Sequence, residues 1–187
     1  TLAPERALAA DLGATLQTDA LTLEAVVFTQ AIEQLILFVP VSAYLVEAAN
    51  TGAATTRGVE ASARWRPHRR VTLSAHYTFT DAHLQITPQP ALPNRPRHRA
   101  RAALTLSTKH VTLTPAAAWR SAATLDLLGR LKNTPFLDLQ ARATVHLPHR
   151  LAAHLSAENL LDRRDVLDTT QRPLPGRTLG LTLSYDR

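Results

Sequence analysis

Apolar and polar residues alternate strictly in several stretches of the chain. In residues 59–65 every odd position is apolar and every even position is polar, and residues 71–79 repeat this pattern. Because successive side chains of a β-strand point to opposite faces, each stretch predicts a strand with one apolar and one polar face. The short polar segment 67–70 lies between them, so the two stretches predict a β-hairpin.

The same alternation returns further along the chain and predicts two more hairpins, in residues 101–114 and 137–157. Each has a short polar turn at its centre. Longer connections separate the predicted strands, at residues 81–98, 121–135 and 161–177. Short turns at one end of the strands and long loops at the other are typical of an outer-membrane β-barrel.

Two segments fit a helix as well as a strand. Residues 5–17 are rich in Ala and Leu, with leucines at helical spacing, and residues 152–161 also fit a short helix. However, the apolar residues Leu8, Ala10, Leu12, Ala14 and Leu16 also lie at every second position, as in a strand. Agreement with the rest of the chain favours strands in both segments.

The length of the chain sets the number of strands that we expect. No window holds the ~18 consecutive apolar residues of a membrane-spanning helix, and the longest apolar run, residues 35–39, stops at Pro40. A helical membrane protein is therefore excluded. The 187 residues suffice for about ten membrane-spanning strands with their turns. We predict an all-β fold, an antiparallel transmembrane β-barrel segment.

Charge and composition narrow the possible partners. The chain has 21 basic and 15 acidic residues, and the arginines are scattered rather than clustered in one segment. This distribution favours turns and an aqueous lumen over a nucleic-acid surface. The chain has no cysteine, which excludes disulfide bonds and thiol chemistry.

The sequence predicts no catalytic, metal-binding or cofactor site. The eight histidines form no His-Glu-x-x-His pair, and the six glycines lack the spacing that binds phosphates. No serine lies in a Gly-x-Ser-x-Gly turn. Glu158 and Asp162 lie at a strand end, where a role in a turn is favoured over acid–base catalysis. We therefore expect a protein that is not an enzyme.

The densest basic patch, residues 95–101, bears on the lumen of the predicted barrel. Arg99 and Arg101 fall on the same side of their strand as Ala103 and Thr105, which is the polar side. A charged side chain facing lipid would cost about 2–4 kcal/mol at mid-membrane. Five residues are candidates for the lumen: Glu60, Arg64, Arg99, Arg101 and Arg142. There they would contact lumenal acidic groups, a plug or an anionic ligand. The candidates for the outward face are Val59, Ala61, Trp65, Val71, Leu73 and Leu113.

Several short motifs resemble those of TonB-dependent outer-membrane receptors. Residues 50–60 contain Asn50, Gly52 and Gly58-Val59-Glu60, which is similar to the Asn-x-Gly-x-x-x-x-x-Gly-Val-Glu stretch of that family. Residues 2–5 resemble the Leu-Lys-Pro-Glu that opens one of the family's strands. Further matches follow in the family's order at residues 77–82, 92–98, 158–162 and 176–178.

The resemblance implies a function as well as a fold. In this family a 22-stranded barrel encloses an N-terminal plug, and residues 1–187 would be the C-terminal part of the barrel, without the plug. It implies a place in the outer membrane of a Gram-negative bacterium. The partners would be membrane lipid and, through the plug, TonB, and the cargo a ferric siderophore, cobalamin or haem. The chain ends in Asp186-Arg187, whereas the family usually ends in an aromatic residue.

Two other hypotheses remain open at this point. The chain could be a complete outer-membrane barrel of about ten strands with a structural or enzymatic role. Alternatively, its aromatic residues could belong to the core of a soluble β-sandwich that acts as a binding module. In a barrel the apolar face of the strands contacts lipid, whereas in a β-sandwich it packs against a second sheet.

Overall fold

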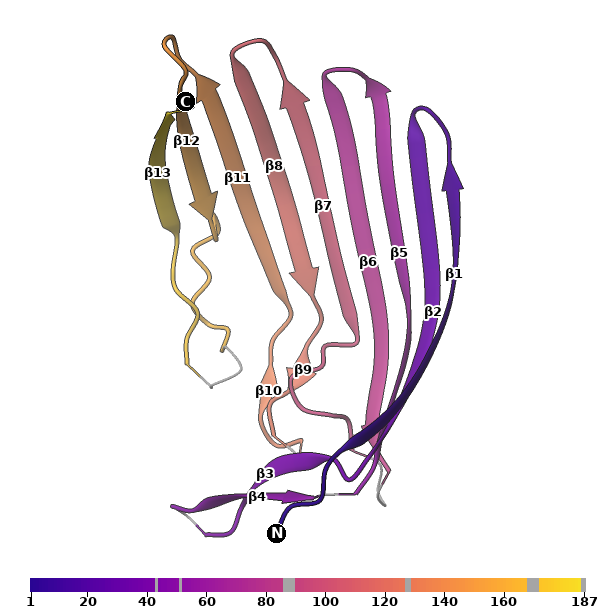
Figure 1. Ribbon diagram of the computed structural model, residues 1–187. Helices are drawn as coiled ribbons and strands as arrows, with labels where there is room; N and C mark the ends of the chain where they lie inside the picture. Colours follow the sequence, from indigo (N-terminus) through magenta and orange to yellow (C-terminus); the bar gives the residue numbers. More distant parts are fainter. Residues whose placement is uncertain (43, 51, 86–89, 127–128, 168–171, 186–187) are drawn as a thin grey trace.

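Nine antiparallel strands form one curved sheet in the computed structural model, which describes all residues except 43, 51, 86–89, 127–128, 168–171 and 186–187. The strands lie in the sheet in the order of the chain (Figure 1). They are β1 (Arg6–Gln17), β2 (Leu21–Glu33), β5 (Ala54–His68), β6 (Val71–Leu84), β7 (His98–Ser107), β8 (Val111–Arg120), β11 (Phe136–His146), β12 (Leu151–Glu158) and β13 (Thr178–Tyr185). The antiparallel all-β prediction is therefore confirmed.

Short turns join the strands at one end of the sheet and long connections join them at the other, as the sequence predicted (Figure 1). Two small hairpins lie within the long connections. They are β3 (Ile36–Pro40) with β4 (Val46–Asn50), and β9 (Ala123–Thr124) with β10 (Lys132–Asn133). The chain ends at Asp186-Arg187, outside the described residues.

The prediction of about ten spanning strands differs slightly from the nine strands of the main sheet in the described part of the chain. The difference arises in residues 34–53, a fourth long connection that the sequence analysis missed. Gln34 adopts a positive φ of 56° and turns the chain away from the sheet. The longest apolar run of the sequence then forms β3, which pairs with β4 beyond the sheet.

Both segments that also fitted a helix form strands over most of their length. β1 pairs with β2 along its whole length, from Arg6 opposite Glu33 to Gln17 opposite Thr22, and β12 pairs with β11 and β13. Pairing with neighbouring strands thus prevails over local helix propensity. None of the described residues belongs to a helix long and apolar enough to cross a membrane.

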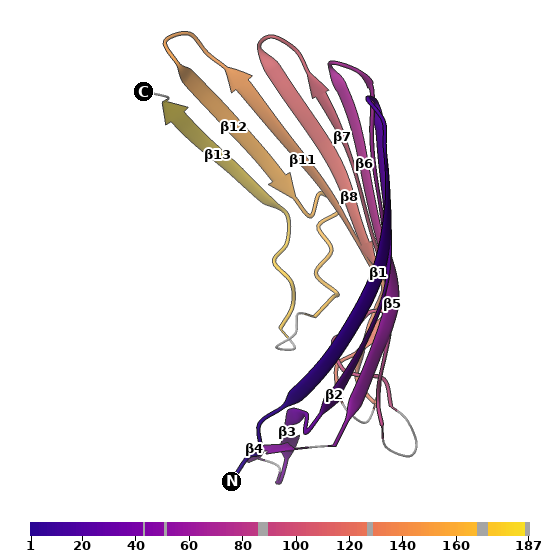
Figure 2. The same ribbon diagram turned by 45° about the vertical axis from the view of Figure 1, so that its right-hand side comes forward.

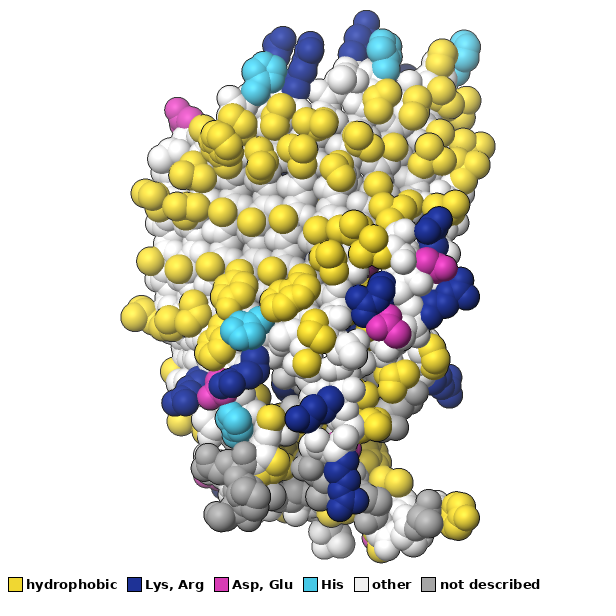
Figure 3. Space-filling model, turned by 180° about the vertical axis from the view of Figure 1, so that it is seen from behind, with side chains coloured by type: hydrophobic (Ala, Val, Ile, Leu, Met, Phe, Trp, Pro, Cys, Tyr) yellow, Lys and Arg dark blue, Asp and Glu magenta, His cyan; other side chains and the backbone are white. Residues whose placement is uncertain are grey.

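The alternation of the sequence sorts the side chains onto two faces. One face is covered with rows of apolar side chains, which are exposed to the surroundings (Figure 3). The residues expected to point outward lie here, because the register pairs Val59 with Phe79, Trp65 with Leu73, and Leu113 with Leu106. In the described chain no second sheet covers this face, which argues against a soluble β-sandwich.

The sheet is curved, and the connection between β12 and β13 lies over its concave, polar face (Figure 2). The buried apolar side chains gather mainly near the long connections rather than between two layers. They are Ala54, Ala82, Leu84, Leu125 and Val166, with Ala152 near the opposite end. The packing of the long connections therefore fixes the end of the sheet where a candidate site lies.

Gly58 of the Gly-Val-Glu motif lies where three strands pack closely. A Cβ atom at this position would overlap the carbonyl oxygen of Phe79 and would lie 2.5 Å from Cζ of Phe28. Phe28 on β2 is the cross-strand neighbour of Gly58, so its ring lies over the glycine backbone. Only a residue without a side chain fits there, which gives the glycine of the motif a physical reason.

Candidate functional site

The polar face carries a hollow of about 960 Å³ at the long-connection end of the sheet. Strands β5 to β8 and β11 form its floor, and Leu174 and Pro96 from the long connections also line it. Its charged lining residues are Glu60, Arg95, Arg99, Arg101, Arg120 and Asp138. Four cations against two acids make this hollow basic.

The register of the strands explains why the arginines meet. Arg99 on β7 lies opposite Thr78 on one side and opposite Arg120 on the other. Directly opposed residues of neighbouring strands place their side chains on the same face, about 5 Å apart at Cβ. Like charges in such positions destabilise the sheet unless an anion lies between them.

The acids of the hollow do not neutralise these arginines in the described structure. Asp138 accepts hydrogen bonds from the side-chain amide of Gln140 at 2.5 Å and from the backbone N–H of Asn159 at 2.9 Å. No ion pair with Arg99 or Arg120 is seen in the described residues. The Arg120 guanidinium lies 5.5 Å from the ring centre of Phe136, and its buried Nη2 has no hydrogen-bond partner among the described residues. The arrangement suits a carboxylate, phosphate or other anionic group.

The structure places three of the five predicted lumen residues together. Glu60, Arg99 and Arg101 line the hollow, whereas Arg64 and Arg142 lie outside it on the same face. Arg64 is opposite Thr22 and Ser74, nearer the short turns, and Nη2 of Arg142 lies 3.8 Å from Oε1 of Glu158. Whether any of the five binds a ligand remains a prediction.

Arg120 and Asp138 also line the hollow and were not predicted from the sequence. Arg120 follows Trp119 at the end of an alternating stretch, a local signal that could have placed it on the polar face. Its position opposite Arg99, however, depends on the register between two strands, which no local pattern gives. Among the described residues, no cluster of three or more His, Asp or Glu side chains is placed to hold a metal ion.

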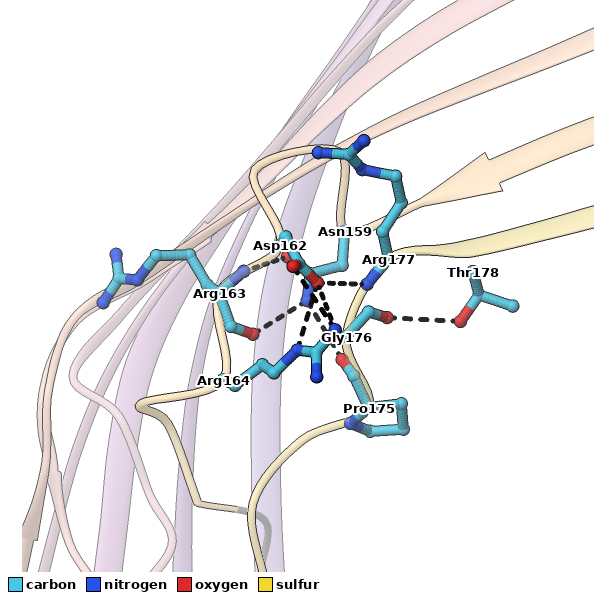
Figure 4. Close-up of polar contacts among 8 residues, drawn as sticks. All are labelled: Asn159, Asp162, Arg163, Arg164, Pro175, Gly176, Arg177 and Thr178. Atoms are coloured by element: carbon cyan, nitrogen blue, oxygen red, sulfur yellow. Dashed lines mark hydrogen bonds and ion pairs between the residues drawn. The ribbon is translucent and has the colours of Figure 1, made fainter.

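The base of the connection between β12 and β13 is closed by Asn159 (Figure 4). Its side-chain amide nitrogen donates to the carbonyl oxygens of Arg163 at 2.8 Å and Pro175 at 3.0 Å. Its side-chain oxygen accepts from the backbone N–H of Arg163 at 3.0 Å. Asn159 is only 6% exposed, and its backbone N–H contacts Asp138, so the clamp is linked to the hollow.

Asp162 holds the two arms of this connection together. Its Oδ1 accepts from the backbone N–H of Arg177 at 2.8 Å and from the guanidinium of Arg164 at 3.1 Å (Figure 4). A Cβ at Gly176 would lie 2.6 Å from this oxygen. The motifs 158–162 and 176–178 thus meet in space, and the expected role of Asp162 in a turn is confirmed.

We expect acid to loosen this clamp. The backbone N–H of Arg177 and then the guanidinium of Arg164 hold the pKa of Asp162 below its usual value of 3.8. Because the folded-state pKa is lowered, the carboxylate stabilises the clamp above about pH 3.8, and this contribution is lost as pH falls through the lower folded value. Hydrogen exchange at Arg177, corrected for the intrinsic rate, should accelerate in that range. In Asp162→Asn the corrected rate should not depend on pH, and the same acceleration in this variant would contradict the prediction.

Comparison with known proteins agrees with this architecture. Residues 1–186 match the family model "TonB dependent receptor-like, beta-barrel". No curated protein matches the chain in sequence. Among solved structures, the copper transporter OprC superposes with a TM-score of 0.83 at 17% identity, over 99% of this chain and 32% of OprC.

Two iron receptors superpose similarly. The ferric yersiniabactin uptake receptor FyuA from Yersinia pestis gives a TM-score of 0.79 at 19% identity, over 96% of this chain and 29% of FyuA. The ferric-catecholate import receptor Fiu from E. coli K12 gives a TM-score of 0.74 at 18% identity, over 97% of this chain and 28% of Fiu. The chain therefore spans about a third of the length of these structures. At these identities the superpositions show only a shared fold. The match of the family model over residues 1–186 shows the family: the chain belongs to the TonB-dependent receptor β-barrel family.

Proposed function

We propose that this chain forms the C-terminal part of the wall of an outer-membrane barrel in a Gram-negative bacterium. The barrel would import a scarce nutrient, such as a ferric siderophore, cobalamin or haem, with energy that TonB delivers to a plug. The structural relatives are described as transporters and receptors, which supports uptake rather than enzymatic chemistry.

The open edges of the sheet support a place in a larger barrel. β1 and β13 form its two edges and do not pair with each other in the described residues. In a bilayer each unpaired backbone group costs several kcal/mol, so both edges need further strands. This observation favours a larger barrel over the alternative of a complete barrel of about ten strands.

The observation that carries the proposal is the basic hollow beneath the long connections. Arg99 and Arg120 face each other there without an acidic partner in the described structure. In a closed barrel the polar face becomes the lumen, so these cations would meet an anionic group of the plug or of the cargo. A hydrogen bond from a charged donor contributes about 1.5–3 kcal/mol.

An uptake assay with the full-length receptor tests this proposal. Cells that lack other receptors would be supplied with ferric catecholate, ferric hydroxamate, cobalamin or haem as the limiting nutrient. We expect uptake of one of these cargoes, lost when TonB is deleted. Arg99→Gln with Arg120→Gln should reduce it about tenfold or more.

The matched control is Arg64→Gln with Arg142→Gln, which removes two cations from the same face outside the hollow and should change uptake less than twofold. Equal losses in both double variants would contradict a special role for the hollow. Uptake of a cargo that does not depend on TonB would contradict the proposed transport mechanism.

A further inference from the structure

Some cations at the long-connection end of the sheet have an acidic partner, whereas the described cations at the short-turn end have none. Near the long connections, Arg57 and Arg97 both contact the carboxylate of Asp81, at 3.2 and 2.8 Å. Among the described residues at the short-turn end, no cation forms an ion pair. These cations, here called the short-turn rim, are Arg66, Arg69, Arg70, Lys109 and Arg150. All are exposed, and the four short turns contain one acid, Asp19.

The short-turn rim borders the apolar face directly. Trp65, which is 48% exposed on that face, precedes Arg66 in the chain. Val111 and Leu151, which are 37% and 41% exposed, follow the next two turns. Basic and histidine side chains project just beyond the apolar rows at the top of Figure 3. They thus lie where a bilayer bounded by these rows would have its headgroups.

A β-bulge turns His68, the neighbour of the rim residue Arg69, toward the apolar side. Trp65 is opposite Leu73, but His68 is opposite Val71, so β5 has one residue more than β6 between the two pairs. Val71 and Leu73 point to the same face, and His68 therefore lies on that face as well. Without the extra residue, this position would fall on the polar face.

The rim turns are also regularly spaced. The β5/β6, β7/β8 and β11/β12 hairpins follow one another in the sheet. Because neighbouring strands lie about 4.8 Å apart, successive turns are about 10 Å apart. The result is a row of unpaired cations along one border of the apolar face.

We propose that the short-turn rim binds the headgroups of anionic phospholipids in the leaflet next to the short turns. The inference rests on the proposed place of the chain in a membrane. Cations near an anionic leaflet attract its headgroups, and an unneutralised row next to an apolar face offers lipid phosphates complementary charge at the membrane border. No acid among the described residues compensates this row, whereas Asp81 compensates Arg57 and Arg97 near the long connections.

Lipid titration of the full-length receptor in neutral detergent tests the proposal. Native mass spectrometry would count bound phosphatidylglycerol, with phosphatidylcholine as the neutral comparison. Arg69→Gln with Lys109→Gln should raise the apparent Kd for phosphatidylglycerol about tenfold to thirtyfold at low salt. Inorganic phosphate should not compete, because the site requires the lipid at the apolar border.

The control is Arg130→Gln with Lys132→Gln, which removes the same charge from exposed positions at the opposite end and should change the Kd less than twofold. Heat-modifiable migration on a gel would verify that each variant is folded. Equal affinity of rim variant and control, or displacement by inorganic phosphate, would overturn the rim proposal while leaving the barrel intact. A receptor that is soluble without detergent would overturn both the rim proposal and the proposed place in a membrane.

Discussion

Replacing Ala102 with arginine should destabilise the membrane-inserted receptor by about 2–4 kcal/mol. Ala102 lies at the centre of β7 on the apolar face, opposite Ala75 and Ala117. These three side chains line a shallow apolar hollow on that face. A guanidinium there would lie near the middle of the bilayer, far from any polar partner.

The neighbouring residue Ala103 provides the matched control. It lies on the polar face, opposite Ser74 and Ala116, so an arginine at this position can reach water in the lumen. Unfolding of the full-length receptor in urea, from vesicles of neutral lipid, would measure both variants. We expect a large decrease in the free energy of unfolding for Ala102→Arg and little change in it for Ala103→Arg. Similar losses would contradict the assignment of the two faces.

Removing the side chain of Asn159 should open the connection between β12 and β13 without unfolding the sheet. Three hydrogen bonds of this buried side chain are lost, each contributing about 1 kcal/mol. Glycine is the appropriate substitute, because Asn159 has a positive φ of 49° that alanine would adopt only with strain. We expect the opening equilibrium to rise about a hundredfold.

Trypsin offers a direct measurement, since Arg163, Arg164 and Arg177 lie within the connection. Cleavage there should accelerate about a hundredfold in Asn159→Gly, if opening is fast relative to cleavage. Asp165→Asn is the control. It breaks only the exposed Arg163–Asp165 ion pair of 2.6 Å, and such pairs contribute about 0–1 kcal/mol. Unchanged cleavage in Asn159→Gly would show that the clamp does not hold the connection.

Much of the fold follows from local patterns in the sequence. Strict alternation is sufficient to predict the β5/β6 hairpin and the face on which Val59 and Glu60 lie, because both depend on a period of two residues. The connection at residues 34–53 could not be predicted in this way. Its apolar run 35–39 looks like part of a strand, and only the turn at Gln34 shows that it leaves the sheet.

The candidate site was predictable only in part. The alternation assigned Glu60, Arg99 and Arg101 to the polar face, but the hollow depends on contacts between distant segments. Arg120 meets Arg99 through the β7–β8 register. The same limit applies to the family motifs. The sequence shows only that the motifs containing Asp162 and Gly176 follow one another along the chain, whereas the structure shows that these two residues lie close together.

The central claim is that one face of this sheet meets lipid and the other meets water. The chain has no cysteine, so single cysteines at residues 72, 73, 74 and 75 of β6 can be introduced into a cysteine-free receptor and tested with a membrane-impermeant maleimide. A lipid-facing wall predicts labelling at Thr72→Cys and Ser74→Cys and protection at Leu73→Cys and Ala75→Cys. Rapid labelling at all four positions in the membrane-inserted receptor would contradict the claim.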